Sequence, residues 1–142
     1  MNGFLLDTNV LSEFSRAGAP DRRVKDWIRN APQETLYVSV LTFAEIRRGI
    51  ALLPTGKRRA QLEEWLAEDL LESFGTRLLP VTRLIADRWA ALSADAQLRG
   101  RPLAVADGLI AATAIEHDLT LVTRNVRDFA DTGTVILNPW NA

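Results

Sequence analysis

Short, continuous apolar runs alternate along the chain with longer stretches in which apolar residues recur at helical spacing. The runs are too short for an amphipathic helix, so they predict strands that are buried on both faces. These predicted strands are FLLD (4–7), TLYVSV (35–40), RLLPV (77–81), LTLVTRN (119–125, a strand leading into a turn) and TVIL (134–137).

The segments between the runs have helical periodicity. In residues 21–31, for example, Val24, Trp27 and Ile28 fall at positions i, i+3 and i+4. Alternation of strands and helices predicts an α/β fold: one domain over residues 1–142, with a mostly parallel sheet of four to five strands flanked by helices on both faces. The other predicted helical segments are 9–16 (a helical turn), 41–53, 57–74, 82–98 and 104–118.

Composition narrows the function classes. The 142 residues suit one globular domain, with 47% hydrophobic and 25% charged residues. The lack of cysteine excludes disulfides, thiolate catalysis and zinc–thiolate sites. No apolar run reaches the ~20 residues that span a bilayer, and the first residues lack a basic signal-peptide region, so we expect a cytoplasmic protein with no membrane contact. A net charge of −1 leaves nucleic-acid binding to local basic patches.

Three acids interrupt apolar patterns and are therefore candidates for chemistry. Asp7 ends the first predicted strand, Glu45 lies early in the helix that follows the second, and Asp107 begins a helix that is otherwise apolar. Sites in parallel α/β folds form beyond the carboxyl ends of the strands, where Asp7 would lie. Taken singly, Asp7 and Asp107 are also explained as caps, and Glu45 as a surface ion pair with Arg47 or Arg48.

Convergence of the three acids would create a cation site. Two carboxylates ~4 Å apart repel by about 4 kcal/mol at an effective dielectric near 20, so such a cluster takes up protons or binds a cation. Hard oxygen ligands favour Mg²⁺, with Mn²⁺ as a substitute. The single histidine, His117, ends a predicted helix and is better explained as a cap than as a ligand or base. Metal-activated water is then the strongest nucleophile available.

Four blocks in this order resemble one known family: LLDTNVLSE, SVLTFAEIRRGI, ADGLIAATAIEHDLTLVTRNVRDF and the terminal NPW. Together they are similar to the PIN-domain ribonucleases of bacterial type II toxin–antitoxin modules, the VapC family, and within it to FitB-like members. The similarity covers essentially the whole chain. It implies a PIN fold and a Mg²⁺-dependent endoribonuclease that hydrolyses RNA phosphodiester bonds with metal-activated water.

The resemblance also implies roles for individual residues. Asp7, Glu45 and Asp107 match the three metal-ligating acids. At the fourth position this chain carries Asn125, where some relatives have Asp, and Asp128 is the next acid. Asn keeps an oxygen ligand but removes a charge, which would weaken binding of a second metal. We expect Asn125 in the site with Asp128 as a helper; supporting residues are Thr8, Asn9 and Thr123.

Partners follow from the same resemblance. It implies a homodimer, also able to form a higher hetero-oligomer, that is inhibited by a VapB/FitA-like antitoxin and meets operator DNA only through that antitoxin. Trp65 and Leu66 belong either to the core or to a partner groove. A basic patch near Glu45 is a candidate for RNA binding, or a solvated helix face; it comprises Arg47, Arg48, Lys57, Arg58 and Arg59.

Three rival functions are considered. A phosphatase of the haloacid dehalogenase type requires a second Asp two residues after the first, where this chain has Asn9. A receiver domain requires a lysine after a late strand, but the two lysines are Lys25 and Lys57. A PIN-like protein with weakened catalysis that only binds RNA or a partner is consistent with Asn125, although three acids are retained.

Overall fold

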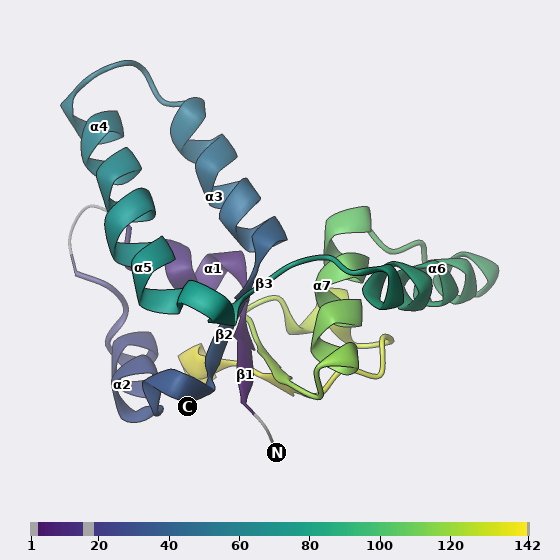
Figure 1. Ribbon diagram of the computed structural model, residues 1–142. Coiled ribbons are helices and arrows are strands. Elements are labelled where there is room, and N and C mark those ends of the chain that lie inside the picture. The colour runs from purple at the N-terminus through teal and green to yellow at the C-terminus, as the bar shows by residue number, and fades with distance from the viewer. Residues whose placement is uncertain (1–2, 16–18, 142) are drawn as a thin grey trace.

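The computed structural model describes residues 3–15 and 19–141 and contains a central parallel sheet (Figure 1). In these residues the sheet has five strands in the order β3-β2-β1-β4-β5, and every neighbouring pair is parallel. The α/β prediction is confirmed, and the sheet is parallel throughout. The strands are β1 (Phe4–Leu6), β2 (Leu36–Ser39), β3 (Leu78–Leu79), β4 (Thr120–Val122) and β5 (Ile136–Leu137).

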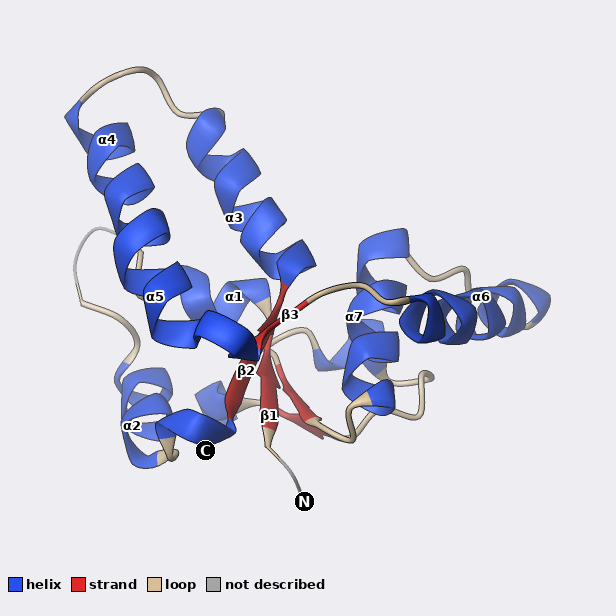
Figure 2. Ribbon diagram, viewed as in Figure 1, coloured by secondary structure: helices blue, strands red, loops and turns tan. Residues whose placement is uncertain are grey.

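Helices cover both faces of the sheet (Figure 2). Helices α3 and α4 stand side by side on one side of the strands, whereas α6 and α7 lie on the other. The helices are α1 (Thr8–Ser12), α2 (Arg22–Asn30), α3 (Val40–Ala51), α4 (Lys57–Glu64), α5 (Leu71–Phe74), α6 (Arg83–Leu98) and α7 (Val105–Glu116).

Alternating residues of the central strands face two separate cores. Leu6 and Val122 belong to the core beneath α1, α2 and α3, whereas Leu5 and Leu121 belong to the core beneath α7. All four side chains are essentially inaccessible to solvent. Continuous apolar runs therefore mark these strands because both faces are covered.

The structure corrects several predicted boundaries. The helix expected over 57–74 is α4 and α5 joined by a π-helical stretch, Trp65–Leu70, in which Leu66 and Leu70 stay buried. The strand expected over 77–81 pairs only at Leu78–Leu79, before Pro80, which lacks the N–H that pairing requires. The helical turn expected over 9–16 is α1 over Thr8–Ser12, and Arg16 lies outside the described residues.

Trp27 and Trp65 have different surroundings. Trp27 packs edge-on against Phe4, with ring centroids 4.9 Å apart. Leu66 belongs to the core, while Trp65 is half-buried and lines an apolar groove of about 450 Å³ with Ile28 and Phe74. Among the described residues, no helix is long and apolar enough to cross a membrane.

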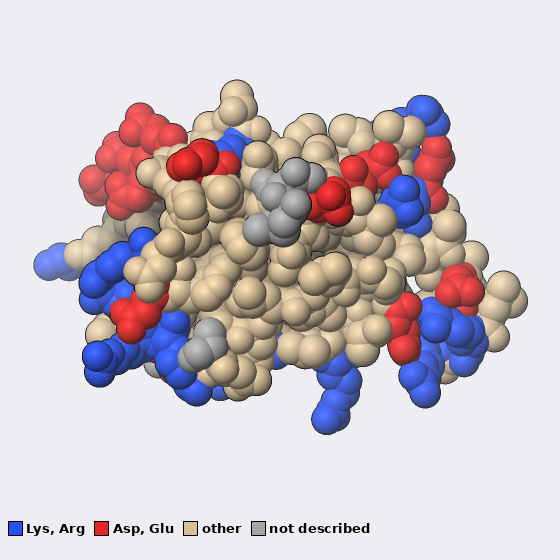
Figure 3. All heavy atoms as spheres, turned by 90° about the horizontal axis from the view of Figure 1, so that it is seen from below, with Lys and Arg blue, Asp and Glu red and all other residues tan. Residues whose placement is uncertain are grey.

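The amino ends of the strands differ from their carboxyl ends. Viewed from below in Figure 3, the middle of the amino-end face consists of uncharged side chains, with Lys, Arg, Asp and Glu around its margin. The candidate acids follow the carboxyl ends of β1 and β4 or lie near the start of a helix. A parallel sheet thus brings them to the opposite edge, where sites in this class form.

Candidate active site

Asp7 connects β1 to α1 and is fixed by hydrogen bonds. It caps α1, because its Oδ1 accepts from the Thr8 backbone N–H at 2.8 Å. Its Oδ2 accepts from the Thr123 hydroxyl at 2.8 Å and from the Asn9 amide at 3.3 Å. The carboxyl is 8% exposed, so these donors hold a buried carboxylate in one orientation. The capping role and a place in the site are therefore compatible.

Thr8 links the first acid to the second. The Thr8 hydroxyl donates to Glu45 Oε1 at 2.7 Å. Glu45 lies in the second turn of α3, which begins directly after β2 with Ser39 as its N-cap. The surface ion pair considered for Glu45 is not formed within the described residues, since Arg47 approaches Glu63 instead, at 4.0 Å.

Asp107 lies in the first turn of α7 and makes no capping hydrogen bond; the N-cap is Ala104. Asp107 is therefore not the cap of α7, although its place in the first turn lets the helix dipole favour its charge. The next residue, Gly108, lies at the contact between the start of α7 and α6. A Cβ at this position would lie only 2.7 Å from Trp89 Cδ1. Only glycine lets the Trp89 indole of α6 pack so closely against α7, and this contact sets where Asp107 stands.

The turn after β4 brings the remaining candidates to the same edge. The Thr123 hydroxyl accepts from the Asn125 backbone N–H at 3.0 Å, and the Asp128 N–H donates to the Asn125 carbonyl at 3.1 Å. These bonds shape a short 3₁₀ helix, Val126–Phe129, that carries Asp128. His117 is the C-cap of α7, about 15 Å along the helix from Asp107, and so lies outside the site.

The acids influence one another electrostatically. Burial, followed by the charges of Asp128, Asp7 and Glu45, raises the pKa of Asp107 to about 6. Burial also raises the pKa of Asp7, although its hydrogen bonds from Thr123, Thr8 and Asn9 oppose that shift. Neighbouring carboxylates thus disfavour the ionised forms of Asp7 and Asp107, which is the environment a cation stabilises.

The donor chemistry fits a hard divalent cation, but the acids do not yet form a complete cage. In the part of the chain that is described, no three His, Asp or Glu side chains stand close enough together to hold an ion. Glu45 is exposed and bound to Thr8, and bringing carboxylates within ~4 Å costs about 4 kcal/mol. A cation would offset that repulsion, because its charge is opposite to theirs.

Comparison with known proteins places the chain in a family. The PIN domain matches residues 4–135. Toxin FitB of Neisseria gonorrhoeae is 41% identical over 137 residues, 96% of this chain and 98% of FitB. The chain belongs to the PIN-domain family.

Two further comparisons support this assignment. VapC ribonuclease Y4jK of Sinorhizobium fredii is 42% identical over 136 residues, which are 96% of each protein. In the solved structure of FitAB bound to the IR36 DNA fragment, a chain superposes with a TM-score of 0.90 at 39% identity; the match covers 96% of this chain and 95% of that one. The likeness to this family inferred from the four sequence blocks is confirmed.

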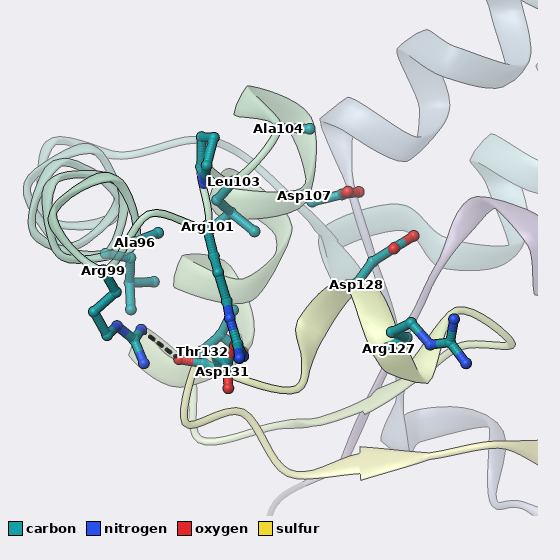
Figure 4. A pocket seen from close by; sticks show the side chains of 12 residues that line it. Ala96, Arg99, Arg101, Leu103, Ala104, Asp107, Arg127, Asp128, Asp131 and Thr132 are labelled. Atoms are coloured by element: carbon teal, nitrogen blue, oxygen red, sulfur yellow. Dashed lines mark hydrogen bonds and ion pairs between the residues drawn. The ribbon is translucent and has the colours of Figure 1, made fainter.

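A cavity of about 420 Å³ opens beside the acids of this PIN domain (Figure 4). Asp107 and Asp128 form one rim, where their carboxylates point in the same direction. Arg101 lies across the cavity and pairs with Asp131 at 2.9 Å, and Arg99 donates to the Asp131 carbonyl at 3.1 Å. Asp107 and Asp128 were predicted from the sequence, but the contacts of Arg99 and Arg101 with Asp131 were not, because they join segments about 30 positions apart.

The predicted basic patch of the PIN domain is largely engaged with the protein itself. Arg58 donates to the Ser15 carbonyl, and Arg59 donates to the Leu53 carbonyl at 3.4 Å. Arg47 and Arg59 both approach Glu63, at 4.0 Å and 3.9 Å. The contacts of Arg47 and Arg59 tie α3 and α4 together, and they leave Arg48 and Lys57 as the patch members with neither an ion pair nor a side-chain hydrogen bond among the described residues.

Proposed function

We propose that the protein is a Mg²⁺-dependent endoribonuclease and the toxin of a type II toxin–antitoxin module. The observation that carries the proposal is the gathering of four carboxylates at the carboxyl edge of a PIN sheet, where burial and then the charges of the other three raise the pKa of Asp107 to about 6. The names of the relatives support the substrate and the toxin role, since one is a toxin and another a VapC ribonuclease.

Asp7, Glu45 and Asp107 would hold the cation, with Mn²⁺ as a substitute for Mg²⁺. Such an ion supplies activated water and stabilises charge on the phosphoryl oxygens. The residues of this chain supply the geometry: Asn9 and Thr123 orient the Asp7 carboxylate, and the Thr8 hydroxyl holds Glu45. Because Asp7 is the most constrained, we assign it the role of fixed ligand, towards which Glu45 and Asp107 close.

We place Asp128 rather than Asn125 at the fourth acidic position. The charge of Asp128 raises the pKa of both Asp7 and Asp107, and Asp128 shares a cavity rim with Asp107. Asn125 contributes its backbone to the turn and lines only the neighbouring hollow, whereas Asp128 lines both that hollow and the cavity beside Asp107. Asp128 would then supply the charge that Asn125 lacks, through a residue three positions later.

The partners we propose are RNA as substrate, a second copy of the chain, and a VapB/FitA-like antitoxin through which operator DNA is met, within a larger hetero-oligomer. The FitAB structure bound to DNA supports this arrangement. For the antitoxin contact we propose the apolar groove beside Trp65, between α2 and the π-helical stretch, because Phe14 on its rim is 37% exposed.

A second candidate is a catalytically weakened PIN protein that only binds RNA or a partner. It is favoured by Asn125 at a position where some relatives carry an acid and by the incomplete cage among the described acids. Retention of all three principal acids favours the active enzyme, because Asp7 and Glu45 both add to the repulsion that, after burial, raises the pKa of Asp107.

Mapping of cleavage sites in total RNA distinguishes the two. After brief induction of the protein in cells, new RNA 5′ ends should appear at defined positions. The Asp7→Asn variant, produced to the same level, should give none of them. If the parent and the variant yield the same pattern, the ribonuclease proposal is wrong; if neither yields new ends while the protein still binds RNA, the weakened PIN protein is the better account.

A further inference from the structure

A polar hollow of about 760 Å³ lies beside the Val126–Phe129 turn and shares Arg127 and Asp128 with the cavity of Figure 4. In that view the Arg127 side chain points away from Arg101 and from Asp131. Besides Asp128, its lining is rich in groups that bind nucleic acids, namely Arg124, Asn125, Arg127, Asn138 and Asn141.

The hollow is joined to the acidic site through the side chain of Asn9. Its Oδ1 accepts from the Arg124 backbone N–H at 3.1 Å, while its Nδ2 donates to Asp7 Oδ2 at 3.3 Å. The Arg124 guanidinium lies over the ring of Trp140, 5.1 Å from its centroid, and Trp140 is buried. Asn9 therefore lies between Arg124 and Asp7 and is hydrogen-bonded to both. The buried Trp140 ring stabilises the charge of the Arg124 guanidinium.

The C-terminal segment supplies amides to the same hollow. Asn138 Oδ1 accepts from the Trp140 backbone N–H at 3.0 Å, and the Asn138 carbonyl accepts from the Asn141 N–H at 3.1 Å. These bonds fold the NPWN sequence into a compact turn against the turn after β4. An amide both donates and accepts, so Asn138 and Asn141 can contact a sugar hydroxyl or a base edge.

Arg127 has the most available charge of this region. Within residues 3–15 and 19–141 its guanidinium makes no ion pair, whereas Arg101 is paired with Asp131 and Arg59 approaches Glu63. A guanidinium that carries two donors in one plane matches the oxygens of a phosphate. Among the described residues, Arg127 is therefore an unpaired cation that lies beside Asp128 in the lining of both hollows, close to the acids of the site.

We propose that the polar hollow binds the single-stranded RNA segment next to the scissile phosphate. Arg127 and Arg124 contact its phosphates, and Asn138 and Asn141 contact its sugar hydroxyls or bases. This subsite rests on the proposed ribonuclease function and names the path its substrate takes. It replaces the patch on α3 and α4, whose arginines mostly bind the protein's own carbonyls and Glu63.

Binding measurements test the subsite separately from catalysis. The Asp7→Asn protein, which leaves the RNA intact, is titrated against a fluorescent single-stranded RNA of about twelve nucleotides at several salt concentrations. Adding Arg127→Ala should weaken binding about tenfold, as expected for loss of a charge-assisted contact. It should also reduce the slope of log K against log salt by about 0.7, the value for one phosphate of a single strand.

Two matched Arg→Ala variants serve as controls. Arg22 lies on α2, where its side chain is 93% exposed, so Arg22→Ala changes the net charge equally but should leave the slope unchanged. Arg48→Ala tests the rival path over α3. If Arg48→Ala reduces the slope and Arg127→Ala does not, the RNA runs along the helices and the subsite is wrong. Binding that is undetectable in the Asp7→Asn parent also overturns it.

A further variant tests recognition of the sugar. Asn141→Ala should reduce the preference for the RNA over a DNA of the same sequence, because an amide contact to a 2′-hydroxyl exists only with RNA. An unchanged ratio overturns the assignment of Asn141. The proposed function fails on a different result, namely the absence of RNA cleavage by the unaltered protein.

Discussion

Asp7 and Asp107 are two acids of one site that the fold treats differently. Asp7 is 8% exposed and accepts hydrogen bonds from Thr8, Thr123 and Asn9. Asp107 has no capping bond and faces the charges of three other acids, and its pKa is about 6. Hydrogen bonds hold the Asp7 carboxylate, whereas the Asp107 carboxylate keeps its position although burial and the neighbouring charges disfavour its ionised form.

The difference separates two ways in which a fold positions a functional group. Asp7 is oriented by local donors, two of which lie in the next two residues of the chain. Asp107 is oriented by packing, because the contact between Trp89 and Gly108 fixes the start of α7. An acid that lowers the stability of the fold and forms no capping hydrogen bond is not explained by folding, so it points to a functional site. Asp107 is therefore the more informative of the two acids about function.

The largest contrast is expected from the Asn variants of the two acids. Each should reduce RNA cleavage by about 100-fold or more, because each removes a proposed metal ligand. Asp107→Asn should raise the thermal midpoint by about 2–4 °C, which corresponds to about 1 kcal/mol after discounting for solvent screening. Asp7→Asn should not raise the thermal midpoint. Both carboxylate oxygens of Asp7 accept hydrogen bonds, so the NH₂ group of the new amide would face a hydrogen-bond donor. Equal increases in the thermal midpoints of the two variants would contradict the distinction between Asp7 and Asp107.

Removal of the Thr123 hydroxyl tests the donors around Asp7. Thr123→Val takes away the bond to Asp7 Oδ2 and the acceptor of the Asn125 N–H, so it should cost about 2–3 kcal/mol in denaturant unfolding. Thr42→Val is the matched control. Thr42 is also fully buried, but its hydroxyl has no partner in the described residues, so its loss should be neutral or stabilising. Similar costs for both variants would contradict the account.

Enlargement of Gly108 tests the packing that positions Asp107. Gly108→Ala places a methyl group 2.7 Å from Trp89 Cδ1, so α6 and α7 must separate, at about 1–3 kcal/mol. Cleavage should fall as well, since Asp107 moves with the helix. Gly49→Ala is the control in a helix with open space around it, and should stabilise by about 0.5–1 kcal/mol. A Gly108→Ala protein as stable and active as the parent would refute this role for the contact.

The smallest effect concerns pH. The folded-state pKa of Asp107 is raised to about 6 from 3.8, so the folded protein holds this proton more tightly than the unfolded chain. The contribution of Asp107 to stability should therefore rise as pH falls from about 7 to about 4, while cleavage declines below about pH 6 as the ligand is protonated. The midpoint difference between the parent and Asp107→Asn should shrink over this range. A difference that grows on acidification would contradict the shift.

Sequence patterns predicted the order of elements, because continuous apolar runs are expected wherever both faces of a strand are covered. They could not fix the short edge strands: β3 and β5 have two residues each, and their limits depend on partners far away in the chain. The acids were predictable since each interrupts an apolar pattern. Their surroundings were not, because the Thr123 hydroxyl reaches Asp7 across 116 positions.

The basic patch shows the same limit. Arg58 and Arg59 form a charged run in the sequence, yet Arg58 binds a carbonyl 43 positions away. Arg127 belongs to no charged run, so the sequence does not single it out. Its position in the lining of two hollows is what makes it a candidate for binding a phosphate. Charge runs describe composition, whereas the availability of a charge depends on the tertiary contacts that surround it.

The most direct test of the central claim is the rate of cleavage of one labelled RNA as a function of Mg²⁺ concentration, for the parent and for Asp107→Asn. The parent should show no cleavage in chelator and a rate that rises to saturation with Mg²⁺. The variant should stay about 100-fold slower at every concentration, although it is folded and at least as stable. Cleavage that persists in chelator, or that Asp107→Asn performs at the rate of the parent, would contradict a metal-dependent ribonuclease built on these acids.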